Sequence, residues 1–231
     1  MRRLPAVPER PSQPPGAADA SELEPIEPRT EPPSVEEPEA ALDPEVVARR
    51  EEALSRIRRF GDPILRTRAR AVDRIDDSLR SEIERMGRLM GDALGVGLAA
   101  TQVGVLHRLL VYRVVPDAPV AALINPTLEW TGEETEPMEE GCLSLPGVLV
   151  DVERPIQVRV RALGAEGEEL LVEASGLEAR VIQHEIDHLD GVLILDRTSR
   201  EQRREAIRAL REATQGEGAP RQDAQRSDQA A

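Results

Sequence analysis

The stretch Gln183–His188, with the sequence Gln-His-Glu-Ile-Asp-His, constrains this chain more than any other. Its two histidines, His184 and His188, stand four residues apart, and Glu185 directly follows the first. On an α-helix, side chains at positions i and i+4 lie on one face, so two imidazoles in this spacing can bind one metal ion. The adjacent carboxylate can then reach a water molecule on that ion. Because H-E-x-x-H is short and also arises by chance, the prediction needs a third ligand from elsewhere.

The residues around this stretch predict a helix. Ser175 and Glu178 fit a capping box, in which each side chain bonds the other residue's backbone N–H. Gly191 stands where a helix commonly ends.

Composition and charge exclude several classes of protein. The net charge of −14 argues against nonspecific binding to DNA or to an anionic membrane. The 30 basic residues are all arginine, which excludes chemistry that needs a lysine nucleophile. A single cysteine excludes an internal disulfide. No apolar run is long enough to span a membrane, and no signal-peptide core follows the N-terminal arginines, so we expect a cytoplasmic protein.

Both ends of the chain are predicted to be disordered. Residues 1–48 hold 11 of the 19 prolines, are acidic and show no apolar periodicity. An interaction tail is the alternative for this segment. Between these ends we expect a catalytic domain over 49–197 and a helix over 198–213, followed by a tail over 214–231.

Periodicity predicts helices and strands within the domain. A short helix over 45–57 should end before Gly61-Asp62-Pro63, which favours a turn. An amphipathic helix over 76–93 should bury Met86 and Met90 in the core. The expected strands cover residues 107–115, 119–125, 128–131, 148–152, 156–163 and 168–174.

Two other stretches carry residues of chemical interest. Residues 95–102 read Gly-Val-Gly-Leu-Ala-Ala-Thr-Gln, and we interpret them as tight backbone that a ligand can approach, because no strand precedes them as in a dinucleotide loop. Residues 138–147 hold Cys142 in what we predict to be a loop punctuated by Gly and Pro. A buried inert thiol is the alternative for this cysteine. The third histidine, His107, is expected at the surface.

Three motifs together resemble a known family. Residues 95–102, Glu140-Gly141-Cys142-Leu143-Ser144 and His184-Glu185-Ile186-Asp187-His188 are similar, in order and spacing, to the signature motifs of peptide deformylases. The resemblance extends from about Ile57 to about Asp196. It implies an α+β fold with small antiparallel or mixed sheets around a central metal-binding helix, and further helices at both ends of the domain.

The resemblance implies that Cys142, His184 and His188 ligate one divalent metal ion, with water in the fourth position. Three protein ligands and an open position are typical of a catalytic site. The family typically uses Fe²⁺, for which Zn²⁺, Ni²⁺ or Co²⁺ can substitute, whereas the donor atoms alone favour zinc.

The resemblance also implies the reaction. The substrates would be N-formylmethionyl nascent peptides, and the products formate and a free N-terminal methionine. Glu185 would act first as general base and then as general acid. The side-chain amide of Gln102 and the backbone N–H of Leu143 would stabilise the negative oxygen. Thr101 stands where the family usually has proline, which removes no catalytic group.

Specificity would come from a methionine pocket and from backbone pairing. Family analogy and helix facing predict that the pocket is lined by Val96, Met138, Leu177 and Val181. Extended peptide would pair with backbone around Gly97 and Gly147. Arg180 either rims this pocket or is an ordinary solvated arginine.

Other interpretations remain open at this point. An H-E-x-x-H endopeptidase would need a further ligand after the second histidine; the acidic residues there are Asp190, Asp196, Glu201 and Glu205. A catalytically silent metal-binding module is the second alternative. In the last helix, an arginine stripe either contacts ribosomal RNA phosphates or is solvated while Ile207 and Leu210 dock the helix.

Overall fold

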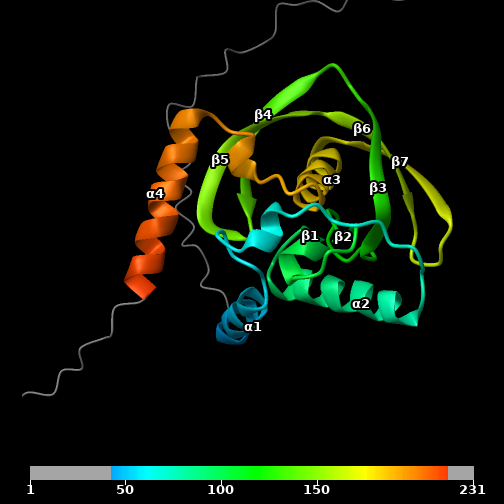
Figure 1. The fold of residues 1–231 in the computed structure, drawn as a ribbon, viewed down its shortest axis with the longest axis horizontal. Helices are drawn as coiled ribbons and strands as arrows, with labels where there is room; N and C mark the ends of the chain where they lie inside the picture. The colour runs from blue at the N-terminus through cyan, green and yellow to red at the C-terminus, as the bar shows by residue number, and fades with distance from the viewer. Residues whose placement is uncertain (1–42, 218–231) are drawn as a thin grey trace, which may run out of the picture. The chain divides into compact units, whose positions relative to one another are not determined.

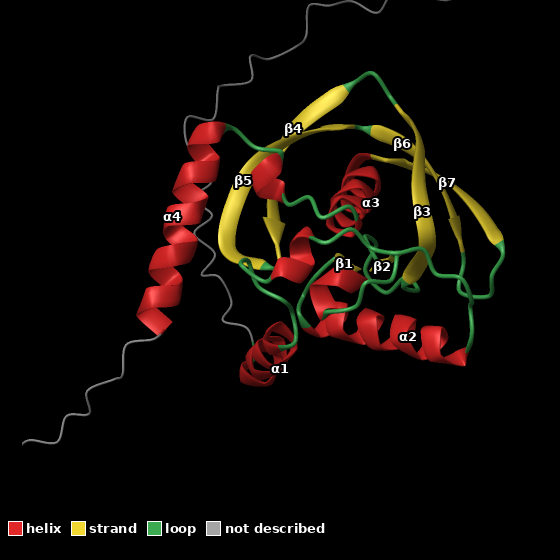
Figure 2. Ribbon diagram, viewed as in Figure 1, coloured by secondary structure: helices red, strands yellow, loops and turns green. Residues whose placement is uncertain are grey.

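Five antiparallel strands form the larger of two sheets, in the order β1-β2-β3-β6-β7 (Figures 1 and 2). The computed structural model describes residues 43–217, with side chains as far as residue 213. The strands are β1 (Gly97–Ala99), β2 (Leu109–Tyr112), β3 (Ala121–Thr131), β6 (Gln157–Leu163) and β7 (Glu169–Ser175). The antiparallel pairing confirms the predicted α+β class.

A two-stranded ribbon of β4 (Thr135–Cys142) and β5 (Leu145–Pro155) forms the second sheet. The prediction of a loop over 138–147 was therefore wrong, because β4 reaches Cys142 and only two residues separate it from β5. The sequence does not predict this strand because it contains Pro137 and three glutamates, and Thr135 is its only β-branched residue. Proline is tolerated here because β4 pairs on one side only.

Helix α3 (Gly176–Leu189) carries the histidine motif and lies within the curve of the strands (Figure 1). Its apolar residues Ile182, Ile186 and Leu189 pack in one cluster with buried side chains of β2 and β6. Ser175 is the N-cap, but its side chain makes no capping bond, so the predicted capping box is wrong. The carboxylate of Glu178 instead accepts a hydrogen bond from the Tyr112 hydroxyl at 2.9 Å.

Helix α2 (Asp77–Asp92) covers the opposite face of the sheet at β2. Met86 and Met90 are fully buried, as predicted. Strand alternation explains why all four β2 residues are buried: Leu110 and Tyr112 belong to the α3 cluster, whereas Leu109 and Val111 belong to the α2 cluster. Strand β2 is therefore packed between the two helices, with α3 on one face and α2 on the other.

Helix α1 (Pro44–Ser55) begins inside the segment predicted to be disordered, so that prediction was wrong for residues 44–48. Asp43 caps the helix by accepting from the N–H of Glu45, and Pro44 suits the first helical position, where no N–H is needed. Residues 1–42, the rest of the predicted extension, lie outside the described residues.

Helix α4 (Arg200–Glu217) runs four residues beyond the predicted end. Ala206 and Leu210 are buried in a cluster with Val148 and Val150 of β5. Residues 218–231 of the predicted tail lie outside the described part. Three short 3₁₀ helices complete the described elements: η1 (Pro63–Arg66), η2 (Ala100–Val103) and η3 (Ile194–Asp196). Between residues 43 and 217, every helix is too short or too polar to cross a bilayer.

His107 lies at the surface, as expected, but it has a structural partner. Its Nδ1 is 2.9 Å from Oε2 of Glu82, a carboxylate that is only 8% exposed. The other carboxylate oxygen of Glu82 has no partner among the described residues.

We therefore expect His107→Ala to lower the free energy of unfolding by about 1–3 kcal/mol, because it leaves a buried carboxylate unpaired. Adding Glu82→Met should recover most of this loss, since an apolar side chain of similar volume needs no partner. Urea unfolding of both variants and of Glu82→Met alone measures the coupling. Additive losses would show that the pair contributes nothing.

Candidate active site and metal centre

Helix α3 places His184 and His188 on one face, as the spacing predicts. Their ring centroids are 5.0 Å apart, and His188 is almost fully buried. Gly191 has a left-handed backbone with φ of 75°, just past the helix end. Its Cα also lies against the backbone of Arg66, where a Cβ would approach within 2.7 Å. Only glycine therefore fits at position 191, where the chain turns away after the helix.

Strand β4 brings Cys142 to the two histidines. Its Sγ lies 3.2 Å from Nε2 of His188, and one donor atom from each of Cys142, His184 and His188 falls within 4.8 Å of the others. This is the only cluster of at least three potential ligands among residues 43–217. Cys142 and His184, which are 42 positions apart in the sequence, thus belong to the same candidate metal site.

The donor set fits a divalent ion. Sulfur and nitrogen ligands around one tetrahedral ion are about 3.5 Å apart, close to the observed separation of sulfur and imidazole. Two buried polar atoms nearby, Nδ1 of His188 and Oε2 of Glu185, have no hydrogen-bond partner among the described residues. Three protein donors leave a fourth position open, which is typical of catalytic sites.

Glu140 fixes the orientation of His184. Its Oε2 lies 3.0 Å from Nδ1 of His184, so that nitrogen donates and Nε2 is left for a metal. Burial alone would raise the pKa of Glu140, but hydrogen bonds and charge from His184 and Arg154 outweigh it and hold the pKa at about 2. The carboxylate is therefore ionised throughout the physiological range.

Two buried arginines hold Glu140. Arg154 donates two bonds to its carboxylate, at 2.6 and 2.9 Å, and a third at 2.8 Å to Asp187 within the histidine motif. Arg180 donates to Glu140 at 2.8 Å and to backbone carbonyls of β4 and β5. The alternative of a solvated Arg180 is wrong, because only 7% of the residue is exposed.

Glu185 points from α3 toward β1. A Cβ on Gly97 would lie 2.4 Å from Oε1 of Glu185 and 2.9 Å from Val181, so the carboxylate requires glycine at this position. The tight backbone predicted at residues 95–102 thus accommodates a protein side chain. Burial raises the pKa of Glu185 to about 7, although charges of His184 and Arg154 lower it. A carboxylate tuned to this range suits proton transfer.

Gln102 is oriented by its own turn. Its side-chain carbonyl accepts from the N–H of Ala99 at 2.8 Å, which directs the amide nitrogen toward Cys142 at 3.7 Å and the Ser144 hydroxyl at 3.3 Å. Leu143 follows the cysteine in the turn between β4 and β5, and its side chain packs on Gly95, where a Cβ would come within 2.9 Å.

These residues line one cleft of about 590 Å³. Every residue predicted to bind substrate lies in its wall: Val96, Gly97, Met138, Leu177 and Val181. The cleft also reaches Gln102, Cys142, Leu143, His184 and Glu185. His188 is not in the wall of the cleft and is only 1% exposed.

Comparison with known proteins decides the family. The sequence profile of the family described as Polypeptide deformylase matches residues 54–204. A peptide deformylase of Acidothermus cellulolyticus is 48% identical over 161 residues, which are 70% of this chain and 88% of that protein.

The chain belongs to the peptide deformylase family.

Solved structures agree with this assignment. The peptide deformylase of Synechococcus elongatus, determined in complex with actinonin, is 45% identical with a TM-score of 0.64, covering 66% of this chain and 85% of its own. The peptide deformylase of Legionella pneumophila is 37% identical with a TM-score of 0.67, covering 71% and 98%. The chain is therefore a metal-dependent hydrolase of this family.

Membership in the peptide deformylase family removes the rival interpretations, and the geometry gives the reason. Of the downstream acidic residues, Asp190 bonds Arg108 at 2.7 Å and Asp196 pairs with Arg66 and Arg203. Glu201 and Glu205 are exposed on α4. None of them joins the histidines of this deformylase as an endopeptidase ligand would.

Sequence reasoning missed the residues that support the ligands of the deformylase site. The sequence marks Glu140 only as part of a motif, and it predicts no role for Arg154 or Asp187. A period of two was the available signal, since Met138, Glu140 and Cys142 alternate and share one face of a strand. Reading residues 138–147 as a loop hid that signal.

We expect Glu140→Gln to weaken metal binding about 10- to 100-fold, because the amide is a poorer acceptor for His184 and no longer balances the two arginines. Competition with a chelator measures the affinity, and the metal content of the purified protein checks it. Glu139→Gln, at an exposed neighbouring position, is the matched control. Equal affinity in the two variants would contradict the orienting role of Glu140.

Proposed function

We propose that this chain removes the formyl group from the N-terminal formyl-methionine of newly synthesised proteins and releases formate. The observation that carries this proposal is the convergence of one thiol and two imidazoles beside one buried carboxylate, with Cys142, His184 and Glu185 in the wall of a single cleft. Family membership supports the same activity.

Cys142, His184 and His188 would hold one divalent ion. Bound there, the ion would supply Lewis acidity toward the formyl group and lower the pKa of a water molecule. We propose Fe²⁺ as the ion, in keeping with the family resemblance, although sulfur and nitrogen donors also suit Zn²⁺, Ni²⁺ and Co²⁺.

Glu185 moves the proton. With a pKa near 7 and a free Oε2 inside the cleft, its carboxylate accepts a proton from the attacking water and later donates it to the leaving amine. Gly97 allows this position because it has no side chain.

Gln102 and Leu143 provide donors for the formyl oxygen as it becomes negative. The amide of Gln102 is already fixed by its bond from Ala99, so little reorganisation is needed during reaction. The backbone N–H of Leu143 is the second donor, next to the cysteine.

The methionine side chain occupies the part of the cleft lined by Val96, Met138, Leu177 and Val181. Val96, Met138 and Leu177 are large apolar residues that are 40–50% exposed, which favours an apolar ligand. Strand β1 is the end strand of its sheet, so the backbone at Gly97 has a free edge where extended peptide can pair. Gly147 lies in the wall of the same cleft and offers a second contact.

We expect Glu185→Gln to lower kcat for a formyl-Met peptide by at least about a hundredfold, because the amide cannot accept the proton. The protein should still bind one ion, since the three ligands remain. Formate release and metal analysis after anaerobic purification measure the two quantities and identify the ion. Activity close to that of the unmodified enzyme would refute the assigned role.

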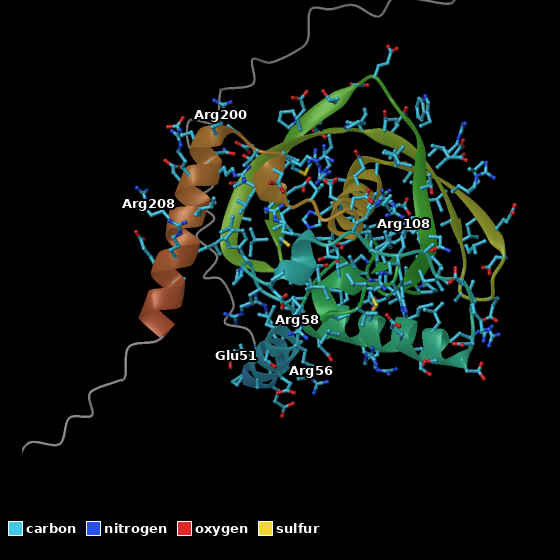
Figure 3. The ribbon with its side chains drawn as sticks, in the orientation of Figure 1. Glu51, Arg56, Arg58, Arg108, Arg200 and Arg208 are labelled. Atoms are coloured by element: carbon cyan, nitrogen blue, oxygen red, sulfur yellow. The ribbon has the colours of Figure 1, made fainter. Side chains whose placement is uncertain are left out.

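We further propose that the enzyme acts in the cytoplasm, where nascent chains are made, and contacts the ribosome through α4. The helix docks through Ala206, Ile207 and Leu210, which leaves Arg200, Arg204, Arg208 and Arg211 exposed. Figure 3 shows Arg208 on the side of α4 away from β5. Such a stripe suits RNA phosphates.

Replacing Arg204 and Arg208 together by Gln should reduce co-sedimentation with ribosomes, and the loss should be largest at low salt. The double variant Arg85→Gln and Arg88→Gln removes the same charge from α2 and should bind as the unmodified protein does. Equal binding of both double variants would refute the contact and leave the arginine stripe as solvated surface.

A further inference from the structure

The substrate cleft is larger than a methionine side chain requires, and α1 forms part of its wall. Arg50 and Leu54 of α1 line the cleft together with Leu94 and Leu149, which come from distant parts of the sequence. Leu94 and Leu149 are 53% and 63% exposed, so they mark the open end of the cleft. The family profile matches residues 54–204, so Arg50 lies outside the residues that it matches.

Helix α1 is held firmly beside the catalytic residues. Ala53 and Ile57 are buried in the same cluster as Leu79 and Ile83 of α2. Just after the helix, the N–H of Arg58 donates to the carbonyl of Gln102 at 2.7 Å. The place of α1 relative to the active site therefore follows from packing and from a direct backbone bond (Figure 1).

Most charges in the cleft wall are buried, and those of Glu140, Arg180 and His184 are matched within one network. The exposed charged residues of the wall are Arg50 and Glu139. Strand alternation turns Glu139 to the face of β4 opposite Glu140, toward its cross-strand partner Asp151.

Arg50 is the cation left for a ligand. Among the described residues it makes no ion pair. A formylated N-terminus carries no positive charge, so the charges of a substrate lie on its side chains.

We propose that Arg50 is a specificity-determining residue that binds an acidic side chain of the substrate, downstream of the formyl-methionine. The proposal rests on formyl removal in this cleft and adds a charge preference to it. An exposed ion pair of this kind changes binding about two- to fivefold. The preference should vanish in about 1 M salt, where the screening length falls to about 3 Å.

The test compares formyl-Met peptides of equal length with amidated C-termini. They carry Glu, Gln or Lys at one of the positions two to four, and kcat/KM is measured for each. The unmodified enzyme should prefer Glu over Lys, through KM and not kcat. Arg50→Gln should abolish this preference, and Arg50→Glu should reverse it in favour of Lys, a gain that misfolding cannot produce.

Arg49→Gln is the matched control, because this neighbour on α1 lies in the groove toward Leu89 and Asp92 of α2 and not in the cleft. It should retain the preference for Glu. If Arg50→Glu kept the preference for the Glu peptide, the role of Arg50 would be overturned. The same would hold if Glu139→Gln changed the preference and Arg50→Glu did not. Failure of the unmodified enzyme to release formate from the Gln peptide would instead overturn the proposed function.

Discussion

The buried carboxylate of Glu140 is the contact on which the rest of the site depends. It accepts from His184 of α3 and from Arg154 of β5, and it belongs to β4, so three elements meet at one group. A carboxylate in such a place is costly unless its partners are well aligned. The observed arrangement satisfies all of them, which fixes the ribbon against the helix. Cys142 is two residues further along β4 and shares the face of Glu140, so the same contact brings the sulfur to the histidines.

The two structural periods explain how distant residues reach one centre. A period of 3.6 on α3 aligns His184 with His188, and a period of two on β4 aligns Glu140 with Cys142. The motif on α3 also carries Asp187, which faces Arg154. Thus β4 supplies one ligand and the carboxylate that orients His184, and α3 supplies two ligands and the carboxylate that holds Arg154. The pairing leaves Glu185 directed at Gly97, where the absence of a side chain makes room for the catalytic carboxylate.

Much of this could be predicted from the sequence, because the strongest signals are local. The histidine spacing, the apolar stripe of α2 and the alternation in β6 each follow from one short window of residues. The features that could not be predicted depend on contacts between residues that are far apart in the sequence. The strand at 135–142 is stabilised by pairing with β5 and not by its own propensity. Likewise, Glu178 binds the distant Tyr112 in place of the local cap, and Arg180 turns inward because Glu140 lies there.

Stability alone does not explain why this core is ionic. An apolar cluster of the same volume would hold β4, β5 and α3 together equally well or better. Such a cluster could not select the tautomer of His184, since only an acceptor at Nδ1 leaves Nε2 free for a metal. Once one carboxylate is buried for that purpose, Arg154 and Arg180 balance its charge, and Asp187 balances that of Arg154. The series of pairs ends at Arg197, whose side chain bonds Asp187 and is 49% exposed. The buried network therefore runs from the orienting carboxylate of Glu140 to an arginine in contact with solvent.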